Sequence, residues 1–209
     1  MTPRARTDID PATAGHRAFY QLMTSVIVPR PIAWVSTRSA AGVDNLAPHS
    51  FFTVAAVSPP VVQFTSVGRK DSLTNAEQTG EFVVCLATEA LFEQVNATAT
   101  DFDPGTSEFD AVGLAREPSL RVAPPRVAAS PVALECRLRQ VVEIGDCFVA
   151  LGEVLHAAVA TEVLGADGLA DIGRLAPLSR LGRDEWGCTP PIREITRIRA
   201  ADWPGHYRR

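Results

Sequence analysis

Lysine is almost absent from this chain of 209 residues. Lysine and arginine together number 20, and only one of them, Lys70, is a lysine. Aspartate and glutamate number 24, so the formal net charge is −4. Proteins that bind nucleic acid usually carry a basic surplus, which this chain lacks, so we expect no nucleic-acid partner.

Long hydrophobic runs are also missing. Residues 1–20 contain no apolar segment of the signal-peptide type. No stretch elsewhere reaches the roughly 18 consecutive apolar residues that predict a membrane helix. The sequence therefore predicts neither a signal peptide nor a membrane span, and we expect a cytoplasmic protein.

Paired cysteines and nucleotide fingerprints are absent as well. Cys85, Cys136, Cys147 and Cys188 lie far apart, with no C-x-x-C spacing and no nearby histidine pair. This spacing predicts isolated buried thiols rather than a disulfide framework or a metal site. Neither G-x-x-x-x-G-K-[ST] nor G-x-G-x-x-G occurs, so a P-loop or a Rossmann site is not indicated.

What the chain does contain is β-forming sequence. Hydrophobic residues make up 46% and charged residues 21%, which is enough for a full core. Apolar segments bounded by Gly and Pro predict strands over 30–37, 45–57, 61–67, 81–87, 132–145 and 147–160. We expect the second strand to bend at Pro48, and the first three to form an antiparallel meander. The last two predict a hairpin that turns at Gly145 and Asp146.

Helical signals are few. Asp71 or Ser72 could cap a short helix that Gly80 ends. Apolar spacing predicts a second helix over 88–100, and a third short helix is expected near 108–112. Segments 101–131 and 175–187 otherwise have the composition of loops. Strands and helices do not alternate, so a small closed antiparallel β-barrel with a few flanking helices fits best.

The single lysine stands in "GRKDSLTN", residues 68–75. Gly68 permits close backbone approach, Arg69 and Lys70 supply two cations, and a helix start follows. Free N–H groups and the dipole at a helix start favour an anion, so this stretch could hold a phosphate monoester. The alternative is a solvated basic turn with an ordinary helix cap.

The stretch "NLAPHSFF", residues 45–52, interrupts an apolar strand with small and polar residues. Such an interruption permits a flat ligand to approach the strand backbone. The alternative is an edge strand with a bulge. His49 is its one titrating side chain, and a lone histidine is more often packed or exposed than catalytic.

Five motifs in order carry a resemblance to a known family: "VPRPIAWVST", "NLAPHSFF", "SPPVVQF", "GRKDSLTN" followed by "TGEFVV", and "PLSRLG" followed by Trp186. Across about residues 20–190, the chain resembles the flavin reductase-like, FMN-binding split-barrel family, which includes flavoredoxin-type proteins. The resemblance implies a Greek-key-like split β-barrel that dimerises and binds FMN non-covalently near the subunit interface. We accordingly divide the chain into an N-terminal extension (1–18), the barrel domain (19–187) and a C-terminal tail (188–209).

The resemblance also implies which residues contact the cofactor. The end of the first strand would contribute Ser36 and Thr37. The flavin ring and ribityl chain would lie along Asn45, Ala47, Pro48, His49, Ser50 and Phe51. The phosphate would be held by Ser66, Gly68, Arg69, Lys70, Asp71 and Ser72, with the compact Lys70 contact as a reason to keep a lysine there. The C-terminal element would add Arg180 and Trp186, where Trp186 replaces the tyrosine usual in the family.

The chemistry implied is that of the flavin, because no side chain has the pattern of a dedicated acid, base or nucleophile. His49 could tune the flavin or relay a proton. We expect an oxidoreductase in which NAD(P)H reduces FMN and the electrons pass to free flavin, a partner monooxygenase or another acceptor. Two alternatives stay open, an FMN-holding electron carrier without NAD(P)H activity and a barrel that has lost FMN.

Overall fold

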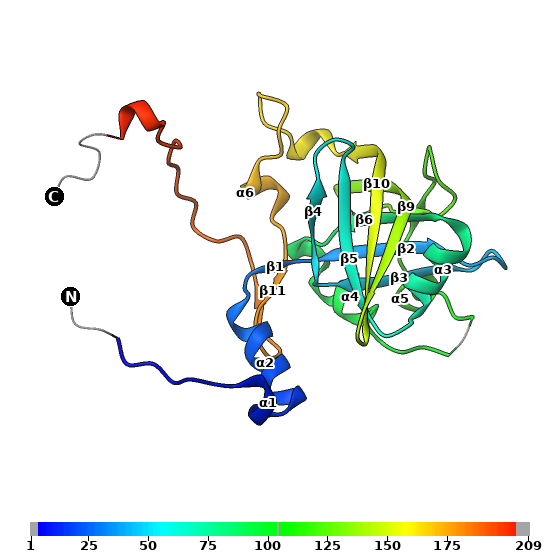
Figure 1. The fold of residues 1–209 in the computed structure, drawn as a ribbon. Coiled ribbons are helices and arrows are strands. Elements are labelled where there is room, and N and C mark those ends of the chain that lie inside the picture. Colours follow the sequence, from blue (N-terminus) through cyan, green and yellow to red (C-terminus); the bar gives the residue numbers. More distant parts are fainter. Residues whose placement is uncertain (1–3, 104, 204–209) are drawn as a thin grey trace.

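The main body of the molecule is one curled antiparallel sheet (Figure 1). A computed structural model describes residues 4–103 and 105–203 of the chain. Within these residues, seven strands follow one another in the order β3 (Asp44–His49), β2 (Ala33–Arg38), β6 (Glu81–Leu86), β9 (Val132–Ile144), β10 (Cys147–Val159), β5 (Val61–Val67) and β4 (Phe52–Ala56). All neighbours are antiparallel. The predicted fold class, a mainly antiparallel β-barrel, is confirmed.

The connection between β3 and β4 differs from the expected meander. β3 pairs with β2, while β4 pairs with β5 at the opposite edge of the sheet. The meander prediction is therefore wrong, because the chain leaves one edge at Ser50 and joins the other at Phe52. This break falls two residues after Pro48, which stays inside β3. An edge strand tolerates Pro48, since proline cannot donate a hydrogen bond to a further strand.

The two edges of the sheet approach one another at this crossing. The Phe51 carbonyl accepts a hydrogen bond from the Thr65 amide of β5 at 2.9 Å. Beside it, the rings of His49 and Phe64 pack with centroids 4.8 Å apart. β3 and β4 themselves are not neighbours in the sheet, so the barrel has a seam where its strands are split.

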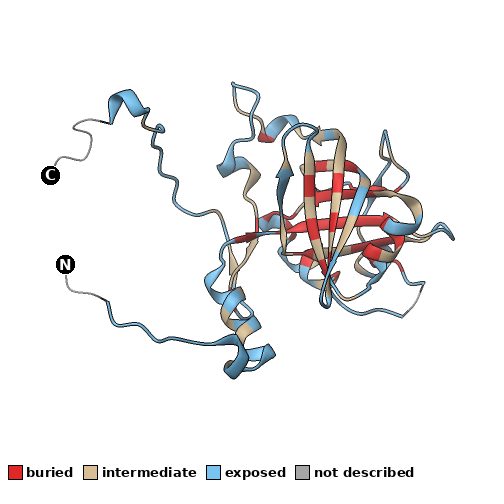
Figure 2. Cartoon of the chain, viewed as in Figure 1, coloured by how far each residue is buried: buried red, intermediate tan, exposed pale blue. Residues whose placement is uncertain are grey.

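Two hydrophobic cores lie on the two faces of this sheet, as the alternation along β2 shows. Trp34 faces one core together with Leu46 and Phe109. Ala33 and Val35 face the other core, which fills the barrel. Successive side chains of a strand point to opposite faces, so β2 is buried on both. Figure 2 shows this buried centre and the exposed segments around it.

Helix α3 (Asp71–Thr79) packs on the barrel through Leu73 and Ala76 and ends at Gly80, which has a left-handed φ of 76°. Lys70 holds the N-cap position, and no side chain caps the helix, so the predicted capping by Asp71 or Ser72 is wrong. The expected helix over 88–100 is realised as η1 (Glu89–Leu91) and α4 (Phe92–Ala97), and the short helix at 108–112 as α5 (Glu108–Val112). The other described helices are α1 (Pro11–Ala14), α2 (His16–Val26), η2 (Thr161–Val163), α6 (Ile172–Leu175) and η3 (Ala200–Asp202).

Both segments that were expected to be loops contain short strands. β7 (Arg116–Glu117) pairs with β8 (Arg126–Val127). In the C-terminal segment, β11 (Ser179–Arg180) pairs with β12 (Trp186–Gly187) and with β1 (Arg30–Pro31). Pairs of two residues carry too little pattern to be read from a sequence. This small sheet fixes the segment that carries Arg180 and Trp186.

Arg30 ties that small sheet to helix α2. Its guanidinium donates to the carbonyls of Thr24 and Ile27 on one side and of Leu181 on the other. Figure 1 shows α1 and α2 outside the barrel, with the N-terminal segment leading into α1 and the C-terminal segment leaving from the region of β11. α2 crosses the boundary that we drew at residue 18, and the domain division stays a prediction. None of the helices within 4–103 and 105–203 is long and apolar enough to cross a membrane.

All four cysteines are free thiols. Cys85 and Cys136 are buried, and burial raises the pKa of each thiol to about 12. Cys147 is half-buried and Cys188 is exposed, so the expectation that all four would be buried is wrong.

Candidate functional site

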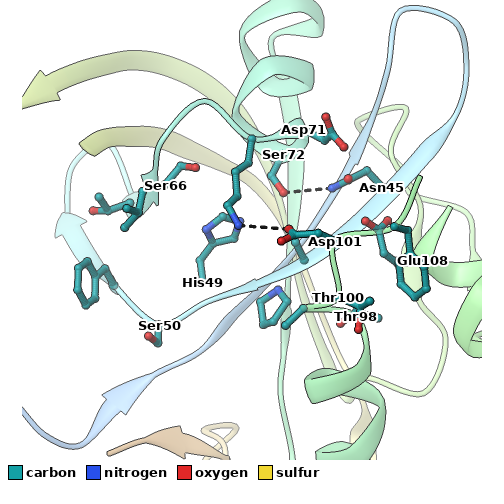
Figure 3. Close-up of a pocket in the computed structure, with 18 of the residues that line it drawn as sticks. Asn45, His49, Ser50, Ser66, Asp71, Ser72, Thr98, Thr100, Asp101 and Glu108 are labelled. Carbon is teal, nitrogen blue, oxygen red and sulfur yellow. Dashed lines mark hydrogen bonds and ion pairs between the residues drawn. The ribbon is translucent and has the colours of Figure 1, made fainter. Parts of the chain in front are cut away.

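A cavity of about 430 Å³ opens at the seam of the barrel (Figure 3). One side, which we call the strand wall, consists of residues from β3, β5 and their crossing: Asn45, Ala47, Pro48, His49, Ser50, Phe51, Thr65, Ser66 and Val67. The opposite side, the loop wall, is formed by Thr98, Ala99, Thr100, Asp101, Phe102, Asp103 and Thr106. The start of α3 closes one end with Lys70, Asp71 and Ser72, and Tyr20 and Glu108 complete the lining.

Most of the residues expected at a flavin site line this cavity. The structure brings together Asn45, Ala47, Pro48, His49, Ser50, Phe51, Ser66, Lys70, Asp71 and Ser72. Their assignment to a cofactor stays a prediction. Ser36, Thr37, Gly68 and Arg69 are not among the lining residues, and Arg180 and Trp186 line a neighbouring cavity.

Ser36 and Thr37 are fully buried in β2. The Thr37 hydroxyl accepts a hydrogen bond from Nδ2 of Asn75 on α3 at 3.2 Å, because this helix covers the end of β2. Ser36 Oγ has no hydrogen-bond partner in the described part of the chain. Neither side chain therefore forms part of the cavity surface.

Gly68 and Arg69 shape the turn before α3. Gly68 has a φ of 78°, which favours glycine, and its carbonyl accepts a hydrogen bond from Ser66 Oγ at 2.8 Å. The Arg69 guanidinium stacks over the Phe148 ring at 4.6 Å and pairs with Glu77 at 2.5 Å. These contacts hold the Arg69 side chain away from the cavity. Of the two cations predicted for the phosphate, Lys70 is therefore the one that lines the cavity.

Lys70 stands at the uncapped start of α3 and reaches across the cavity. Its Nζ lies 3.5 Å from Oδ1 of Asp101 on the loop wall (Figure 3). Both side chains are exposed, with 61% and 92% of their surface accessible. This ion pair therefore contributes little to stability, and another anion can replace Asp101 beside Lys70. The free N–H groups at the helix start add a partial positive charge at the same place. This end of the cavity suits an anion that displaces Asp101.

Glu108 and Asn45 join the loop side to the strand wall. Glu108 Oε2 accepts a hydrogen bond from the Leu46 amide at 2.8 Å. Burial raises the pKa of the Glu108 carboxyl, and the bond from Leu46 opposes that rise. Asn45 Nδ2 donates to Ser72 Oγ at 3.1 Å, while the reversed amide would donate to Glu108 Oε1 at 3.3 Å. This network fixes β3 against the start of α3.

His49 is the titrating group of the strand wall. Its burial lowers the imidazole pKa to about 4, while a hydrogen bond to the Thr65 carbonyl raises it and the charge of Lys70 lowers it further. The side chain is therefore neutral at pH 7. Its Nε2 is buried and has no hydrogen-bond partner in the described residues.

The loop wall was missed by sequence reasoning. It is held by Trp34, whose Nε1 donates to Thr98 Oγ1 at 2.8 Å behind the cavity. Thr98 Oγ1 in turn donates to the Val95 carbonyl at 3.0 Å, which fixes the loop to α4. The remaining lining residues that we did not predict are Ala99, Thr100, Asp101, Phe102, Asp103, Thr106, Glu108, Tyr20, Thr65 and Val67. The run "TATDFD" after a helix, polar and without a strand pattern, was the available signal of a functional loop.

A second cavity of about 530 Å³ adjoins the first and shares Pro48, Ser50 and Ala99 with it. Aromatic and charged side chains form its outer part. Arg180 stacks over the Trp186 ring at 4.6 Å, and Phe92 meets the same ring edge-on at 5.0 Å. The two cavities thus adjoin, with Lys70 lining the first and the stacked Arg180 and Trp186 lining the second.

Comparisons with known proteins agree with this geometry. Residues 23–178 match the family described as "Flavin reductase like domain". A relative from Deinococcus radiodurans is 40% identical over 211 residues, covering 95% of this chain and 93% of its own.

Two solved structures are similar over the whole fold. Nitrilotriacetate monooxygenase component B from Bacillus cereus has a TM-score of 0.87 and 30% identity, covering 92% of this chain and 100% of its own. The 2-nitrobenzoate 2-nitroreductase of Pseudomonas fluorescens has a TM-score of 0.86 and 27% identity, covering 92% and 96%.

Proposed function

The chain belongs to the flavin reductase-like family, and on that premise we propose that it is an FMN-binding oxidoreductase that takes electrons from NAD(P)H. The observation that carries the proposal is the seam cavity, which has an uncapped helix start and Lys70 at one end and the strand wall along one side. A phosphate-bearing flat ligand with a polar linker matches that order of groups.

The residues present fit FMN. Lys70 and the first N–H groups of α3 would hold the phosphate, because an ammonium and free amides both favour an anion. The strand wall from Asn45 to Phe51 would lie along the ribityl chain and the ring. When bound, FMN accepts a hydride from NAD(P)H and passes electrons to an acceptor, which is chemistry that the side chains do not supply.

In the proposed reaction, the chain's own residues would bind the flavin, orient it and shield it from solvent. The strand wall is held by the sheet and by the bond between Leu46 and Glu108, so it presents a fixed surface. His49 is neutral at pH 7 and adds no charge beside the ring. The second cavity, with Trp186 and Arg180, would admit the nicotinamide or the electron acceptor next to the flavin.

The acceptor is a free flavin, a partner monooxygenase or another oxidant in this proposal. Component B of nitrilotriacetate monooxygenase is, by its name, part of a monooxygenase, and the nitroreductase is named for a nitroaromatic compound. Either type of acceptor would reach reduced flavin through the second cavity, which Arg180 and Asp184 help to line.

A homodimer is part of the proposal. Val26 on α2, Val54 on β4 and Val57 beyond it are exposed by 65%, 68% and 87%. A second copy is the commonest way to cover such apolar surface. Light scattering should give a mass of about twice 22.4 kDa, and a monomer that still holds FMN tightly would contradict it.

Rapid mixing tests the reductase function. The FMN-loaded protein is mixed anaerobically with NADH or NADPH while the flavin absorbance is followed. Rapid bleaching with either nucleotide is the expected result. A protein that holds FMN but is bleached by neither nucleotide would be an electron carrier, and one that takes up no FMN would bind a different ligand.

A further inference from the structure

One row across the small three-stranded sheet holds Arg30, Arg180 and Trp186. β11 is the middle strand, so Arg180 stands directly opposite Arg30 of β1 on one side and Trp186 of β12 on the other. Side chains directly opposite in antiparallel strands share a face, and like charges in such a pair are destabilising. Neither guanidinium forms an ion pair with a carboxylate among residues 4–103 and 105–203. The row therefore carries two adjacent positive charges without a carboxylate partner in that part of the chain.

The charge of Arg30 is committed to the fold, whereas that of Arg180 is available to a ligand. Arg30 is 9% exposed, and its guanidinium donates to three backbone carbonyls. Burial lowers the pKa of Arg30, and the charge of Arg180 lowers it further. Arg180 is half-buried and lines the second cavity. An anion bound to Arg180 would offset the repulsion between the two charges.

The neighbours of Arg180 hold its guanidinium but leave most of its donors unused. The guanidinium lies over the Trp186 ring, with Cζ 4.6 Å from the ring centroid, and Phe92 meets the same ring edge-on. Nη2 donates to the Arg183 carbonyl at 3.0 Å. A guanidinium has five N–H donors, so this bond leaves several free. Two of them can bind the two oxygens of a carboxylate or phosphate at once.

The rest of the second cavity suits an apolar body with few polar groups. Its volume of about 530 Å³ falls in the range of small-molecule sites. Asp184 carries the carboxylate among the described lining residues, and it is exposed, so it competes only weakly with a bound anion. Ser50 and Asn96 add a hydroxyl and an amide. The apolar lining consists of Ile32, Pro48, Phe92, Ala99 and Trp186.

We propose that the second cavity binds a small ligand that carries an oxyanion on an apolar body, and that Arg180 holds the oxyanion. Two sources offer such a group, an aromatic carboxylate and the phosphate of a nicotinamide nucleotide. The inference deepens the proposed function and rests on it, since this cavity adjoins the one proposed for the flavin. It assigns Arg180 to the second ligand instead of FMN.

Matched pairs of probes test the proposal on the wild-type protein. The FMN-loaded protein is titrated by calorimetry with benzoate and with benzamide, which has a neutral amide in place of the carboxylate. The second pair is nicotinamide mononucleotide and nicotinamide riboside, which lacks the phosphate. We expect the oxyanion to improve binding roughly tenfold in at least one pair, as for a hydrogen bond to a charged group. A preference in either pair supports the proposal and identifies the source of the oxyanion.

Substitutions in the same segment place that preference on Arg180. Arg180→Gln should abolish it and leave the probes without an oxyanion unchanged, while Arg180→Lys, which keeps the charge but not the planar fork, should retain part of it. Asp184→Asn should strengthen binding of the oxyanion by a few-fold at most. Arg183→Asn is the matched control, because Arg183 is an exposed cation outside the cavity lining and asparagine tolerates its φ of 54°. It should leave the preference intact.

Three results would overturn the proposal: no preference for the oxyanion in either pair, a preference that survives Arg180→Gln, or no binding of any of the four probes. If the wild type takes up no FMN, the proposed function fails, and the titrations are repeated on the FMN-free protein with Lys70→Ala as a further variant. A preference that is lost in Arg180→Gln and kept in Lys70→Ala would still support the inference. Any other result with that protein would overturn it.

Discussion

The strand wall and the loop wall face each other across one cavity, but they are built in different ways. The strand wall is part of the sheet, and its register is fixed by β2 and β5. The loop wall has no ladder and is held by the side-chain bond from Trp34 to Thr98 and by backbone bonds to the end of α4, such as Ala99 N–H to the Asn96 carbonyl at 3.1 Å. The comparison shows one surface held by a strand ladder and an opposite surface held by hydrogen bonds outside any sheet.

The largest effect is expected at Lys70, which stands between the two walls. Lys70→Ala should weaken FMN binding by about 1.5–3 kcal/mol, the range for hydrogen bonds to charged groups, or roughly tenfold and more in dissociation constant. Riboflavin should bind the variant and the wild type equally, because it lacks the phosphate. Titration by flavin fluorescence measures both. An equal loss for both ligands would point to damage of the fold instead.

Trp34→Phe should loosen the loop wall and leave the strand wall in place. It removes the Nε1 donor to Thr98 from a fully buried position, which should lower the free energy of unfolding by about 1–3 kcal/mol. Hydrogen exchange should become faster at residues 98–103 than in β3. Trp186→Phe, the same change at a half-buried position, is the matched control and should cost less stability. Uniformly faster exchange in both walls would contradict the division between them.

Asp101→Asn should have a smaller effect of opposite sign. Asp101 competes with a phosphate for Lys70, so its removal should strengthen FMN binding by a few-fold at most, as for an exposed ion pair. Riboflavin affinity should not change, and Asp103→Asn, which removes a neighbouring charge that has no such contact with Lys70, is the control. Weaker FMN binding in Asp101→Asn would show that the carboxylate helps to hold the ligand.

The smallest effect is optical and concerns the second cavity. Trp186 lines this cavity, and Trp34 lies behind the loop wall, so a bound flavin should quench tryptophan emission. Removal of FMN should raise the emission, and Trp186→Phe should abolish most of the rise. If Trp34→Phe abolishes it and Trp186→Phe does not, the segment 177–186 is not part of the flavin site. Trp203, exposed near the C-terminal end of the described chain, should contribute a constant background.

The two walls also differ in how far the sequence predicts them. The strand wall was predictable because strand alternation and the interruption "NLAPHSFF" are local signals. The position of β3 and β4 at opposite edges of the sheet could not be predicted, because strand pairing depends on contacts between residues far apart in the chain. The loop wall could not be placed for the same reason: Thr98 reaches the site through Trp34, which is 64 residues away in sequence.

The predictions for Arg69 and Lys70, before the start of α3, also show that local sequence does not determine tertiary contacts. The sequence places Arg69 and Lys70 side by side as two cations for one phosphate. In the structure Phe148 and Glu77 hold Arg69 away, and Lys70 alone lines the cavity. The helix start was predicted from its composition, but which of two adjacent side chains faces the site depends on tertiary packing.

The central claim is that the seam cavity binds FMN with its phosphate at Lys70 and the start of α3. The most direct test is a titration of the purified wild-type protein with FMN and with riboflavin, followed by the change in flavin absorbance. We predict uptake of one FMN per chain, with riboflavin bound at least about tenfold more weakly, because the contact with the charged phosphate is lost. No uptake of FMN, or equal affinity for the two flavins, would contradict the account.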